Sequence, residues 1–536
     1  MEKEMPRKNP NLVLDVEENP KKPGQWILFA LQHVLAMFIA CITIPLLTGL
    51  PVAPALLSAG LGTLIYLLLT KKKSPVFLAS SFAYVAPSLS ALGVGMLYKV
   101  GNGNNNYMAL ILGMLMVGLV YVAVALVVKA FGTRWINKLL PPIIVGPVIM
   151  VIGLGLSSSA IGYLTNGPTG YLADGTMNGT LQNPGYNLLA ILCGLVAMVV
   201  TACSSHYGKG KFISLIPFVI GMLSGYVLAA ILTAFSLCFP SGSTGRAYMH
   251  IVDFTPLTSL FEENFGIGTF FNYKMFVPED SESFMFLRLD ELKAYDWGKT
   301  GEVALLFIPV SFVTICEHIG DHENLGNIIG RDLLNGEPGM TRTLSGDGIA
   351  TAVSGALSGL ANTTYGENVA VVGTTRIASS NVVMLAAIMS CVFSFLTPIS
   401  GFLYTIPKCV TGGVSLILYG FIASSGFQML MKNKVDFSIS KNMYVASVIL
   451  VSGIGGLSLK FGAPNDTPVI TITSIAVSMI LGILMNSILR EPKKPVSGIE
   501  VHEDVEMVEK EEKALGQPIE PVSEPAIPAA VASEKQ

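Results

Sequence analysis

The sequence predicts an all-α polytopic membrane protein whose fourteen transmembrane segments form two inverted repeats of seven. Of its 536 residues, 51% are hydrophobic and 13% are charged, whereas soluble domains carry about 25% charged residues. Apolar runs close to the ~20 residues that one span requires recur along the chain. One long polar segment, residues 236–299, has seven of these runs before it and seven after it. An odd number of spans in each half places the two halves in opposite orientations.

The first repeat is expected to cover residues 26–235. Its seven segments lie at 26–47, 53–70, from 76 onward, 107–128, 139–161, 187–203 and 212–235. The third segment is interrupted by Ser80-Ser81-Phe82, which places polar residues in an apolar run. A polar break in a spanning helix survives only where it lines a cavity or is buried in protein. This segment is therefore a candidate for part of a site.

The second repeat is expected to cover residues 300–490. Its segments lie at 303–324, 349–360, 362–380, 382–404, 406–431, 443–459 and 468–489. Three likenesses to the first repeat occur in matching order. The first segments hold the polar pairs Gln32-His33 and Glu317-His318, the third segments are both broken, and the fifth open on Pro-x-x-Val at Pro142 and Pro407. The two broken segments are expected to meet near the middle of the membrane, where transporter folds of this plan place their substrate.

The predicted orientation follows from Lys and Arg in the short loops, which fall on one side of the topology together with both chain ends. Because short cytoplasmic loops are enriched in these residues, both termini are expected in the cytoplasm and residues 236–299 outside it. Residues 1–25 and 491–536 are polar and are predicted to be disordered tails. The chain has no visible cleavable signal and is expected in the plasma membrane.

The seven cysteines lie in or beside apolar runs and have no CxxC spacing. They are interpreted as small core residues. We therefore expect no metal site, no disulfide framework and no cofactor.

The stretch 361–376 carries the leading site hypothesis. It contains Asn, Thr, Gly and the ionisable Glu367 between apolar segments, and a carboxylate at membrane depth is expensive unless it has a partner or a function. Gly366 lets the backbone approach a ligand, and the half-helix that follows points N–H groups at it. This combination suits a planar solute with N–H and C=O groups on its edge. The alternative is a surface loop between two helices.

Four aromatic or imidazole side chains are weaker candidates around this stretch. Phe82 could stack on a ring, although a phenylalanine in a membrane helix is more often a core residue. Tyr365 and Tyr419 are supporting candidates. His33 is a plausible polar partner, and the alternative for it is a buried structural histidine.

The eighth segment is apolar only over residues 303–316, too short to span, so it must continue through Glu317-His318-Ile319-Gly320-Asp321-His322. Glu317 and Asp321 are four residues apart and share one helix face, and His318 and His322 share the adjacent face. Two close acids in a low dielectric cannot both ionise cheaply, which is the requirement for a proton carrier. The alternatives are a helix end already in water, a structural hydrogen-bond network and, less in keeping with the spacing, a metal site.

The sequence Glu367-Asn368-Val369-Ala370-Val371-Val372-Gly373-Thr374-Thr375-Arg376 resembles the signature of the nucleobase–ascorbate transporter family of nucleobase:cation symporters, with Ala370 where the family usually has Gly. Together with Gln32-His33, Ser80-Ser81-Phe82-Ala83 and Glu317-His318-Ile319-Gly320, it looks most like the bacterial uracil branch of that family. The resemblance covers roughly residues 26–490 without 236–299.

This resemblance implies fourteen spans, with segments 1–4 and 8–11 in a core domain and the others in a gate domain. It implies a short strand in each broken segment, the two pairing with each other. The uracil-binding positions fall on Phe82, Glu317, Gly366 and Glu367. Proton coupling would involve Glu317 together with Asp321 or His322. The implied function is uracil import by proton symport with alternating access, in a bilayer, by a homodimer and without a nucleic-acid partner.

Three other functions are compatible with parts of the pattern. A xanthine or urate symporter of the same family is the nearest, and Glu rather than Gln at position 367 argues against it. An anion transporter of the same fold would favour a positive site, whereas this one is acidic. A membrane enzyme would need a nucleophile–base pair or a metal cluster, which the sequence does not offer. The coupling ion, H⁺ or Na⁺, stays open.

Overall fold

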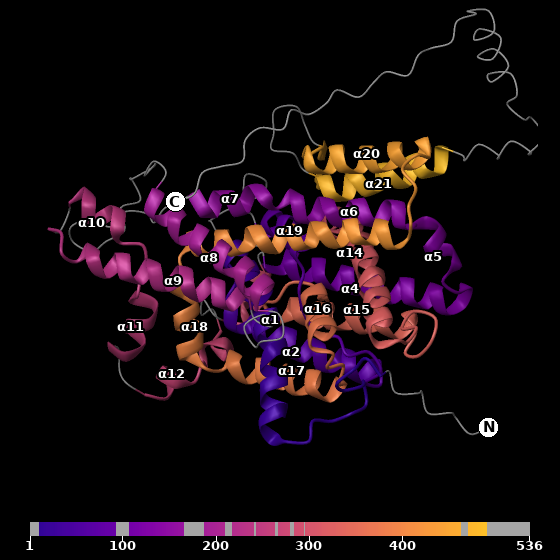
Figure 1. Ribbon diagram of the computed structural model, residues 1–536. Coiled ribbons are helices and arrows are strands. Elements are labelled where there is room, and N and C mark those ends of the chain that lie inside the picture. The colour runs from indigo at the N-terminus through magenta and orange to yellow at the C-terminus, as the bar shows by residue number, and fades with distance from the viewer. Residues whose placement is uncertain are drawn as a thin grey trace, which may run out of the picture. The chain divides into compact units, whose positions relative to one another are not determined.

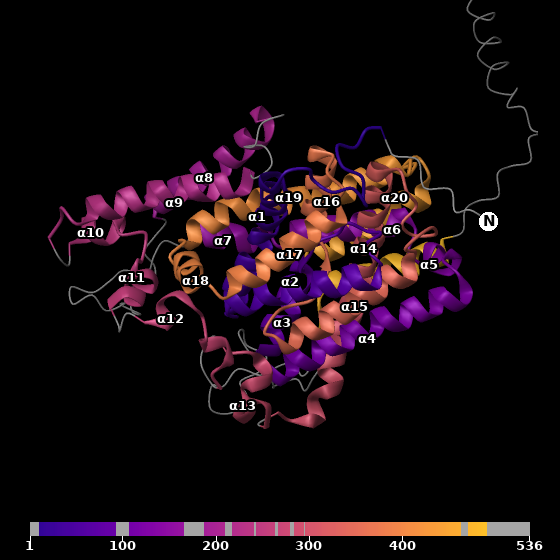
Figure 2. The same ribbon diagram turned by 90° about the horizontal axis from the view of Figure 1, so that it is seen from below.

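The computed structural model describes residues 10–92, 107–165, 187–208, 217–240, 243–262, 266–278, 283–293, 295–461 and 470–489. Most of these residues are helical (Figure 1). The predicted tail 491–536 lies outside the described residues. The described residues between 243 and 299 form short helical pieces that separate two longer sets of elements along the chain (Figure 2).

The first set of elements precedes residue 240. It comprises α1 (Pro23–Thr48), α2 (Val52–Leu69), β1 (Leu78–Ser80), η1 (Phe82–Tyr84), α3 (Val85–Leu92), α4 (Tyr107–Phe131), α5 (Arg134–Leu139), α6 (Pro142–Gly155), α7 (Ser157–Thr165), α8 (Leu188–Tyr207) and α9 (Pro217–Ser236). The middle segment comprises α10 (Thr244–Met249), α11 (Thr255–Glu262), α12 (Ile267–Phe270), η3 (Lys274–Phe276), η4 (Met285–Leu287), α13 (Leu289–Lys293) and η5 (Trp297–Lys299).

The second set begins with the longest helix of the described residues. It comprises α14 (Thr300–Ile329), α15 (Met340–Ala356), β2 (Asn362–Thr364), α16 (Gly366–Thr375), α17 (Ser380–Ser394), α18 (Thr397–Tyr404), α19 (Lys408–Lys432), α20 (Ser440–Ile454), β3 (Leu459–Phe461), β4 (Ile470–Ile472) and α21 (Ser474–Ile488).

Within the described residues, eight helical stretches are long and apolar enough to cross a membrane: α1, α2, α4, α6 with α7, α8, α9, α14 with η5, and α19. The other six predicted segments fall on α3, α15, α16, α17, α20 and α21, which are shorter. The prediction of a polytopic membrane protein is therefore supported. The count of fourteen spans and the inverted repeats stay predictions.

The two broken segments meet in a small antiparallel sheet. Leu78 of β1 faces Thr364 of β2, and Ser80 faces Asn362. Every residue of both strands is buried, so backbone groups at the edges need partners other than water. Side chains supply them: the Thr63 hydroxyl accepts from the Leu78 N–H, and Thr351 donates to the Asn362 carbonyl. The strand pairing that the family resemblance implies is thus present.

Close helix pairs depend on glycines that face each other. A Cβ on Gly118 of α4 would lie 2.5 Å from the carbonyl oxygen of Gly348 on α15, and one on Gly426 of α19 would lie 2.4 Å from that of Gly146 on α6. Small residues let membrane helices approach this closely. Figures 1 and 2 both show α4 beside α15, and Figure 1 shows α6 beside α19.

The sequence predicts a disordered tail over residues 1–25, whereas residues 10–22 make specific contacts with the rest of the protein and α1 already begins at Pro23. The N–H of Val13 donates to the Arg376 carbonyl, and the N–H of Ala378 donates to the Leu14 carbonyl. Leu12 and Val16 are buried in the main core, while Asp15 pairs with Arg331. These contacts are long-range, so local composition gives no sign of them. We call residues 12–19 the N-terminal strap.

The end of the chain's apolar region also differs in detail from the expected helices. Residues 459–461 and 470–472 form the antiparallel pair β3–β4, where the sequence predicts helix ends. Ile470-Thr471-Ile472 is a run of β-branched residues, which lowers helix propensity and favours strands.

Candidate functional site

A cavity of about 630 Å³ lies between α14 and α16 on one side and α19 on the other. Its walls include Glu317 and Asp321 of α14, Gly366 and Glu367 of α16, and Gln428 of α19. This volume is within the range of small-molecule sites. The structure thus brings together four residues predicted to bind substrate or protons, from segments fifty positions apart in sequence.

The two acids of α14 lie one helical turn apart on the cavity face. A Cβ on Gly366 would lie 3.2 Å from Asp321 Oδ1, so the Asp321 carboxylate touches the first residue of α16. Glu317 Oε2 and Asp321 Oδ2 are buried atoms without a hydrogen-bond partner. Buried polar atoms are normally paired, so these two oxygens are candidate acceptors for a polar ligand or carriers for a proton.

Local backbone geometry explains why Glu367 faces the same space. β2 ends at Thr364, Tyr365 stays extended with φ −115° as the N-cap, and α16 starts at Gly366 without a side-chain cap. The first N–H groups of a helix have no intrahelical acceptor, and the helix dipole is positive there. Glu367 in this first turn therefore lies beside backbone N–H groups that can donate hydrogen bonds to the carbonyl oxygens of a ligand.

Three carboxylates of α14 and α16 share this region, and the cavity is also lined by Glu323 and by Lys432, whose Nζ donates to Asn324. Among the ion pairs of the described residues, none involves Glu317, Asp321 or Glu367. Three unpaired charges so close together in a low dielectric repel one another strongly. The arrangement can therefore hold protons, and it can accept hydrogen bonds from N–H groups of a bound solute. It does not favour an anion.

Phe82 and Tyr365 lie beside the cavity around a much smaller space of about 20 Å³, which Glu317 and Glu367 also line. The Phe82 side chain is only 5% exposed, and its ring packs edge-on against Tyr419 of α19 at 5.3 Å. The Tyr365 hydroxyl is buried without a partner. Phe82 and Tyr365 thus line the same small space as Glu317 and Glu367, whereas Tyr419 packs against Phe82.

His33 of α1 contacts the residue that follows Glu367. Its Nδ1 lies 2.7 Å from Oδ1 of Asn368, the residue after Glu367, and its side chain is buried. It does not line the 630 Å³ cavity. Its contact fixes α16 to α1, which fits the structural alternative better than direct ligand contact.

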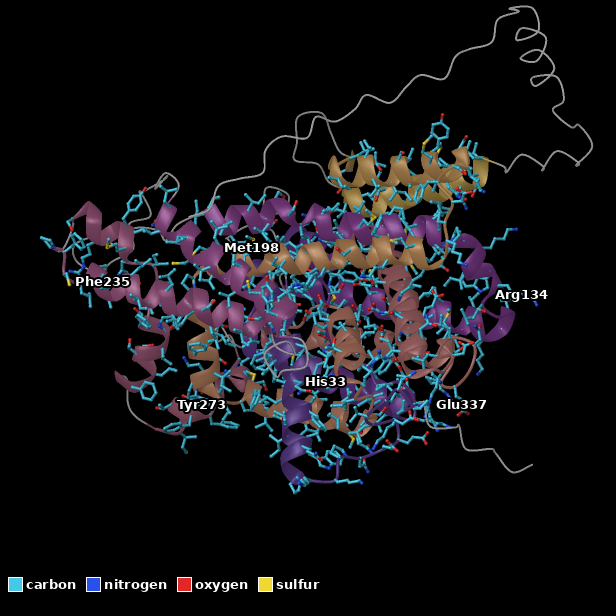
Figure 3. All side chains as sticks on the ribbon, in the orientation of Figure 1. His33, Arg134, Met198, Phe235, Tyr273 and Glu337 are labelled. Atoms are coloured by element: carbon cyan, nitrogen blue, oxygen red, sulfur yellow. The ribbon has the colours of Figure 1, made fainter. Side chains whose placement is uncertain are left out.

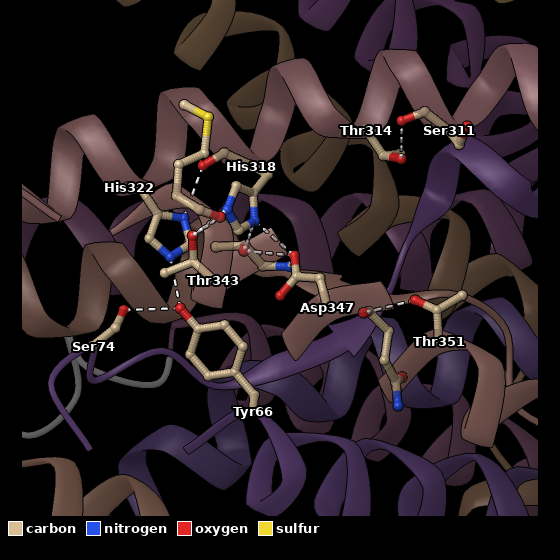
Figure 4. Close-up of polar contacts among 12 residues, drawn as sticks. Tyr66, Ser74, Ser311, Thr314, His318, His322, Thr343, Asp347 and Thr351 are labelled. Atoms are coloured by element: carbon tan, nitrogen blue, oxygen red, sulfur yellow. Dashed lines mark hydrogen bonds and ion pairs between the residues drawn. The ribbon is translucent and has the colours of Figure 1, made fainter. Parts of the chain in front are cut away.

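The adjacent face of α14 carries a separate polar network (Figure 4). His318 Nδ1 lies 2.8 Å from Asp347 Oδ2 of α15, and its Nε2 lies 3.0 Å from the Thr343 hydroxyl. Asp347 Oδ2 also accepts from the backbone N–H and the hydroxyl of Thr364 at 3.2 and 3.0 Å. This network therefore joins α14 and α15 to the strand that precedes Glu367.

His322 belongs to this network and not to the cavity of the acids. Its ring stacks on His318 with centroids 4.0 Å apart, its Nδ1 lies 2.9 Å from the His318 carbonyl oxygen, and its Nε2 lies 2.6 Å from the Tyr66 hydroxyl. It lines a different cavity, of about 640 Å³, with Glu323 and Arg331. Of the three predicted proton-coupling residues, only Glu317 and Asp321 line the cavity that holds Glu367.

The sequence analysis misses Asp347 and Tyr66. The ninth segment is predicted to begin at residue 349, two residues after Asp347, whereas α15 starts at Met340. Asp347 lies between Gly346 and Gly348, both of which pack against neighbouring helices. An acid between two small residues in a helix is the signal that could have placed Asp347 inside the protein.

Comparison with known proteins gives consistent matches. A family model described as "Permease family" (Xan_ur_permease) matches residues 24–460. The uracil permease of Bacillus caldolyticus is 39% identical over 92% of this chain and 98% of its own length. The uracil permeases of Bacillus subtilis strain 168 and Escherichia coli K12 are 35% and 33% identical, covering 88% and 87% of this chain and 94% and 93% of theirs.

Solved structures show the same fold at low identity. The transmembrane domain of the cyanobacterial bicarbonate transporter BicA has a TM-score of 0.54 and 13% identity, over 88% of this chain and 99% of its own. Murine Slc26a9, an anion transporter in the inward-facing state, has a TM-score of 0.56 and 11% identity, over 88% of this chain and 69% of its own.

Proposed function

The chain belongs to the nucleobase–ascorbate transporter family, given its permease-family match over residues 24–460 and its relatives at 33–39% identity, and from this premise we propose that it imports uracil by proton symport. The relatives named uracil permease support the substrate. The main structural support is the meeting of Glu317, Asp321 and Glu367 around the N-terminus of α16.

Uracil has a donor–acceptor edge that suits these groups. Its ring N–H groups donate to the carboxylate of Glu367, and its carbonyl oxygens accept from backbone N–H groups at the start of α16 and near Phe82. Charge-assisted hydrogen bonds of this kind are about twice as strong as neutral ones. Glu317 is the second acceptor, because its Oε2 has no partner in the described residues.

Proton coupling is assigned to the Glu317–Asp321 pair. Their shared helix face and their position against Gly366 put any proton that they hold next to the bound ring. Loading of one proton reduces the repulsion among three acids, so it favours substrate binding. Release of the proton to the cytoplasm then weakens binding and lets the nucleobase leave.

We propose alternating access because the two walls of the cavity come from different helices, which can move relative to each other. α14 and α16 form the wall that carries the acids, and α19 forms the opposite wall with Phe421, Ser425 and Gln428. Sliding of one wall against the other would expose the acids first to one side and then to the other. We further propose the plasma membrane as location, cytoplasmic termini and a homodimer.

Uptake of radiolabelled uracil into proteoliposomes tests this function. We expect accumulation that rises as external pH falls, collapses with a protonophore and is unaffected by a sodium gradient. Unlabelled uracil should compete strongly, and xanthine weakly. Accumulation of xanthine in preference to uracil would overturn the substrate. Accumulation that follows sodium and ignores pH would overturn the proton coupling, and the acids would then be candidates for sodium coordination.

A further inference from the structure

Residues 261–276 present large apolar side chains outward. Phe261, Ile267, Phe270, Phe271, Tyr273 and Phe276 have 44–81% of their surface exposed, and we call them the aromatic surface. They come from α11, α12, η3 and the residues between. A patch of this kind facing water is rare in soluble proteins and marks an interaction site.

The aromatic surface is held in place by the corner between α17 and α18. The N–H of Asn272 donates to the Phe395 carbonyl at 2.8 Å, and the Thr397 hydroxyl donates to the Gly268 carbonyl at 3.0 Å. The rings of Phe271 and Phe276 lie parallel to that of Phe395, with centroids 5.4 and 6.1 Å apart. The outward side chains are therefore fixed by ordered backbone and by stacking.

On the inner side, α11 packs on α18 through its other face. A Cβ on Gly401 would lie 2.7 Å from Leu260 and 3.6 Å from Leu257. Phe261, the next residue along α11, is half exposed. The helix thus turns Leu257 and Leu260 to the protein and leaves Phe261 outward, on a side that also carries the exposed Thr255 and Thr258.

Exposed apolar side chains on the neighbouring helix α17 indicate which medium covers the aromatic surface. Ile388 and Val392 of α17 are four residues apart and are 43% and 51% exposed, so they form one outward stripe of the helix. Leu396, 37% exposed, follows the helix as the extended N-cap of α18. In a membrane protein such a stripe faces acyl chains. The stripe ends at the β-bridge between Leu396 and Phe271, where the aromatic surface starts.

Position in the molecule agrees with a membrane–water boundary. Figure 3 shows Tyr273 and Phe235 at one end of the molecule, with Arg134 and Glu337 at the opposite end. Phe235 lies at the end of α9, a stretch apolar enough to span. Aromatic side chains concentrate at the ends of spans, where an apolar ring meets the headgroups.

We propose that the aromatic surface, Phe261 to Phe276, inserts into the boundary between headgroups and acyl chains of the bilayer and fixes the α17–α18 corner at the membrane surface. This role is separate from substrate binding, because none of the described residues between Phe261 and Phe276 lines the cavity that holds Glu317, Asp321 and Glu367. It gives the long segment 236–299 a function that does not depend on the proposed transport activity.

Depth-resolved tryptophan quenching tests the proposal. The chain has only three tryptophans, Trp26, Trp135 and Trp297. Replacing all three by phenylalanine gives a background into which Tyr273→Trp or Phe276→Trp adds one reporter. In nanodiscs, we expect strong quenching by phosphatidylcholine brominated near the top of its acyl chains, and little quenching by aqueous iodide.

Two controls calibrate the depth. Val392→Trp places the reporter on the α17 stripe and should be quenched best by bromines deeper in the chains. Asn335→Trp lies in an exposed polar turn and should respond to iodide only. Iodide-only quenching of Tyr273→Trp and Phe276→Trp, like that of Asn335→Trp, would overturn the proposal.

Two further arms keep the test decisive. If the triple replacement does not fold, Tyr273→Trp or Phe276→Trp is added to the chain with its native tryptophans, and the quenching of the reporter is taken as the difference from the unsubstituted chain. If the reporters escape both quenchers in discs with two chains but respond to iodide in discs with one, a second copy covers the surface and the lipid contact is wrong.

Discussion

Replacing Asp347 by alanine is expected to damage both stability and substrate binding, although Asp347 does not touch the cavity. Its Oδ2 is the common acceptor for three donors: His318 Nδ1, the Thr364 N–H and the Thr364 hydroxyl. The side chain has no exposed surface, so water cannot replace the lost acceptor without a cavity opening. Thr364 lies three residues before Glu367, and any shift of β2 moves the start of α16.

The magnitude follows from the donors that lose their acceptor. The His318 Nδ1–H can donate to the Thr364 hydroxyl oxygen, 3.1 Å away, which leaves the N–H and the hydroxyl hydrogen of Thr364 stranded. A buried donor without an acceptor costs roughly 1–3 kcal/mol, so even the low end gives a loss of about 2 kcal/mol in the free energy of unfolding. We expect uracil affinity to fall at least tenfold, which corresponds to about 1.4 kcal/mol.

Asp347→Asn separates geometry from charge. Its amide oxygen can occupy the Oδ2 position and keep all three donors, while its NH₂ replaces Oδ1, which already lacks a partner. It should therefore lose much less stability than the alanine variant. Ser345→Ala on the same helix removes one local bond to the Thr341 carbonyl and serves as the matched control, with an expected loss of about 1 kcal/mol.

Chemical unfolding and equilibrium uracil binding, both in detergent, measure these effects. A loss for Asp347→Ala no larger than that for Ser345→Ala would refute the reasoning from stranded donors. Equal damage from Asn and Ala would show that the charge matters and not the acceptor position. Strong destabilisation with unchanged uracil affinity would disconnect β2 from the site.

Three further predictions concern individual carboxylates. Glu367→Gln should weaken uracil binding by roughly 2–5 kcal/mol, because the amide can present a donor to a ring N–H, and an unchanged Kd would remove Glu367 from the site. Glu317→Gln mimics the protonated acid and should keep measurable binding but lose proton-driven accumulation, leaving exchange of labelled for unlabelled uracil; Asp321→Asn should do the same more weakly. The hydrogen bond from Lys73 holds the pKa of Glu17 below its ordinary value of 4.5, so the strap is stabilised above that pH and loosens as pH falls through the lowered pKa. The protection of residues 12–16 against hydrogen exchange, relative to the intrinsic exchange rate at each pH, should fall only below pH 4.5, and Glu17→Gln should show a smaller change with pH.

The sequence could predict the acidic part of the site because helical spacing and a local break were enough. A four-residue interval puts Glu317 and Asp321 on one face, and both line the cavity. The polar break before Gly366 predicts the start of a half-helix, and α16 starts there. The pairing of β1 with β2 was implied by the family resemblance, since three-residue strands carry no alternation that a sequence pattern could detect.

The partners of these residues could not be predicted from spacing. Periodicity identifies the face of one helix but not the helix that packs on it. The contacts of His318 with Asp347 and of His322 with Tyr66 could therefore not be predicted. The N-terminal strap was missed for a related reason. Its apolar run Leu12-Val13-Leu14 is too short to indicate an ordered element, and its hydrogen bonds reach more than 360 positions along the chain.

The cluster Glu317 to His322 is best understood as two units that share one helix. The histidine face is paired: the rings of His318 and His322 bond to Asp347, Thr343 and Tyr66, and these bonds offset the cost of burying polar groups. The acidic face keeps unpaired oxygens toward the cavity. Four ionisable residues in one turn and a half are therefore tolerated because the two histidines are hydrogen-bonded within the protein, and the two acids are left for the proton and solute that we propose. Through Asp347 the histidine face also holds Thr364 of β2, so it positions Glu367 without lining the cavity itself.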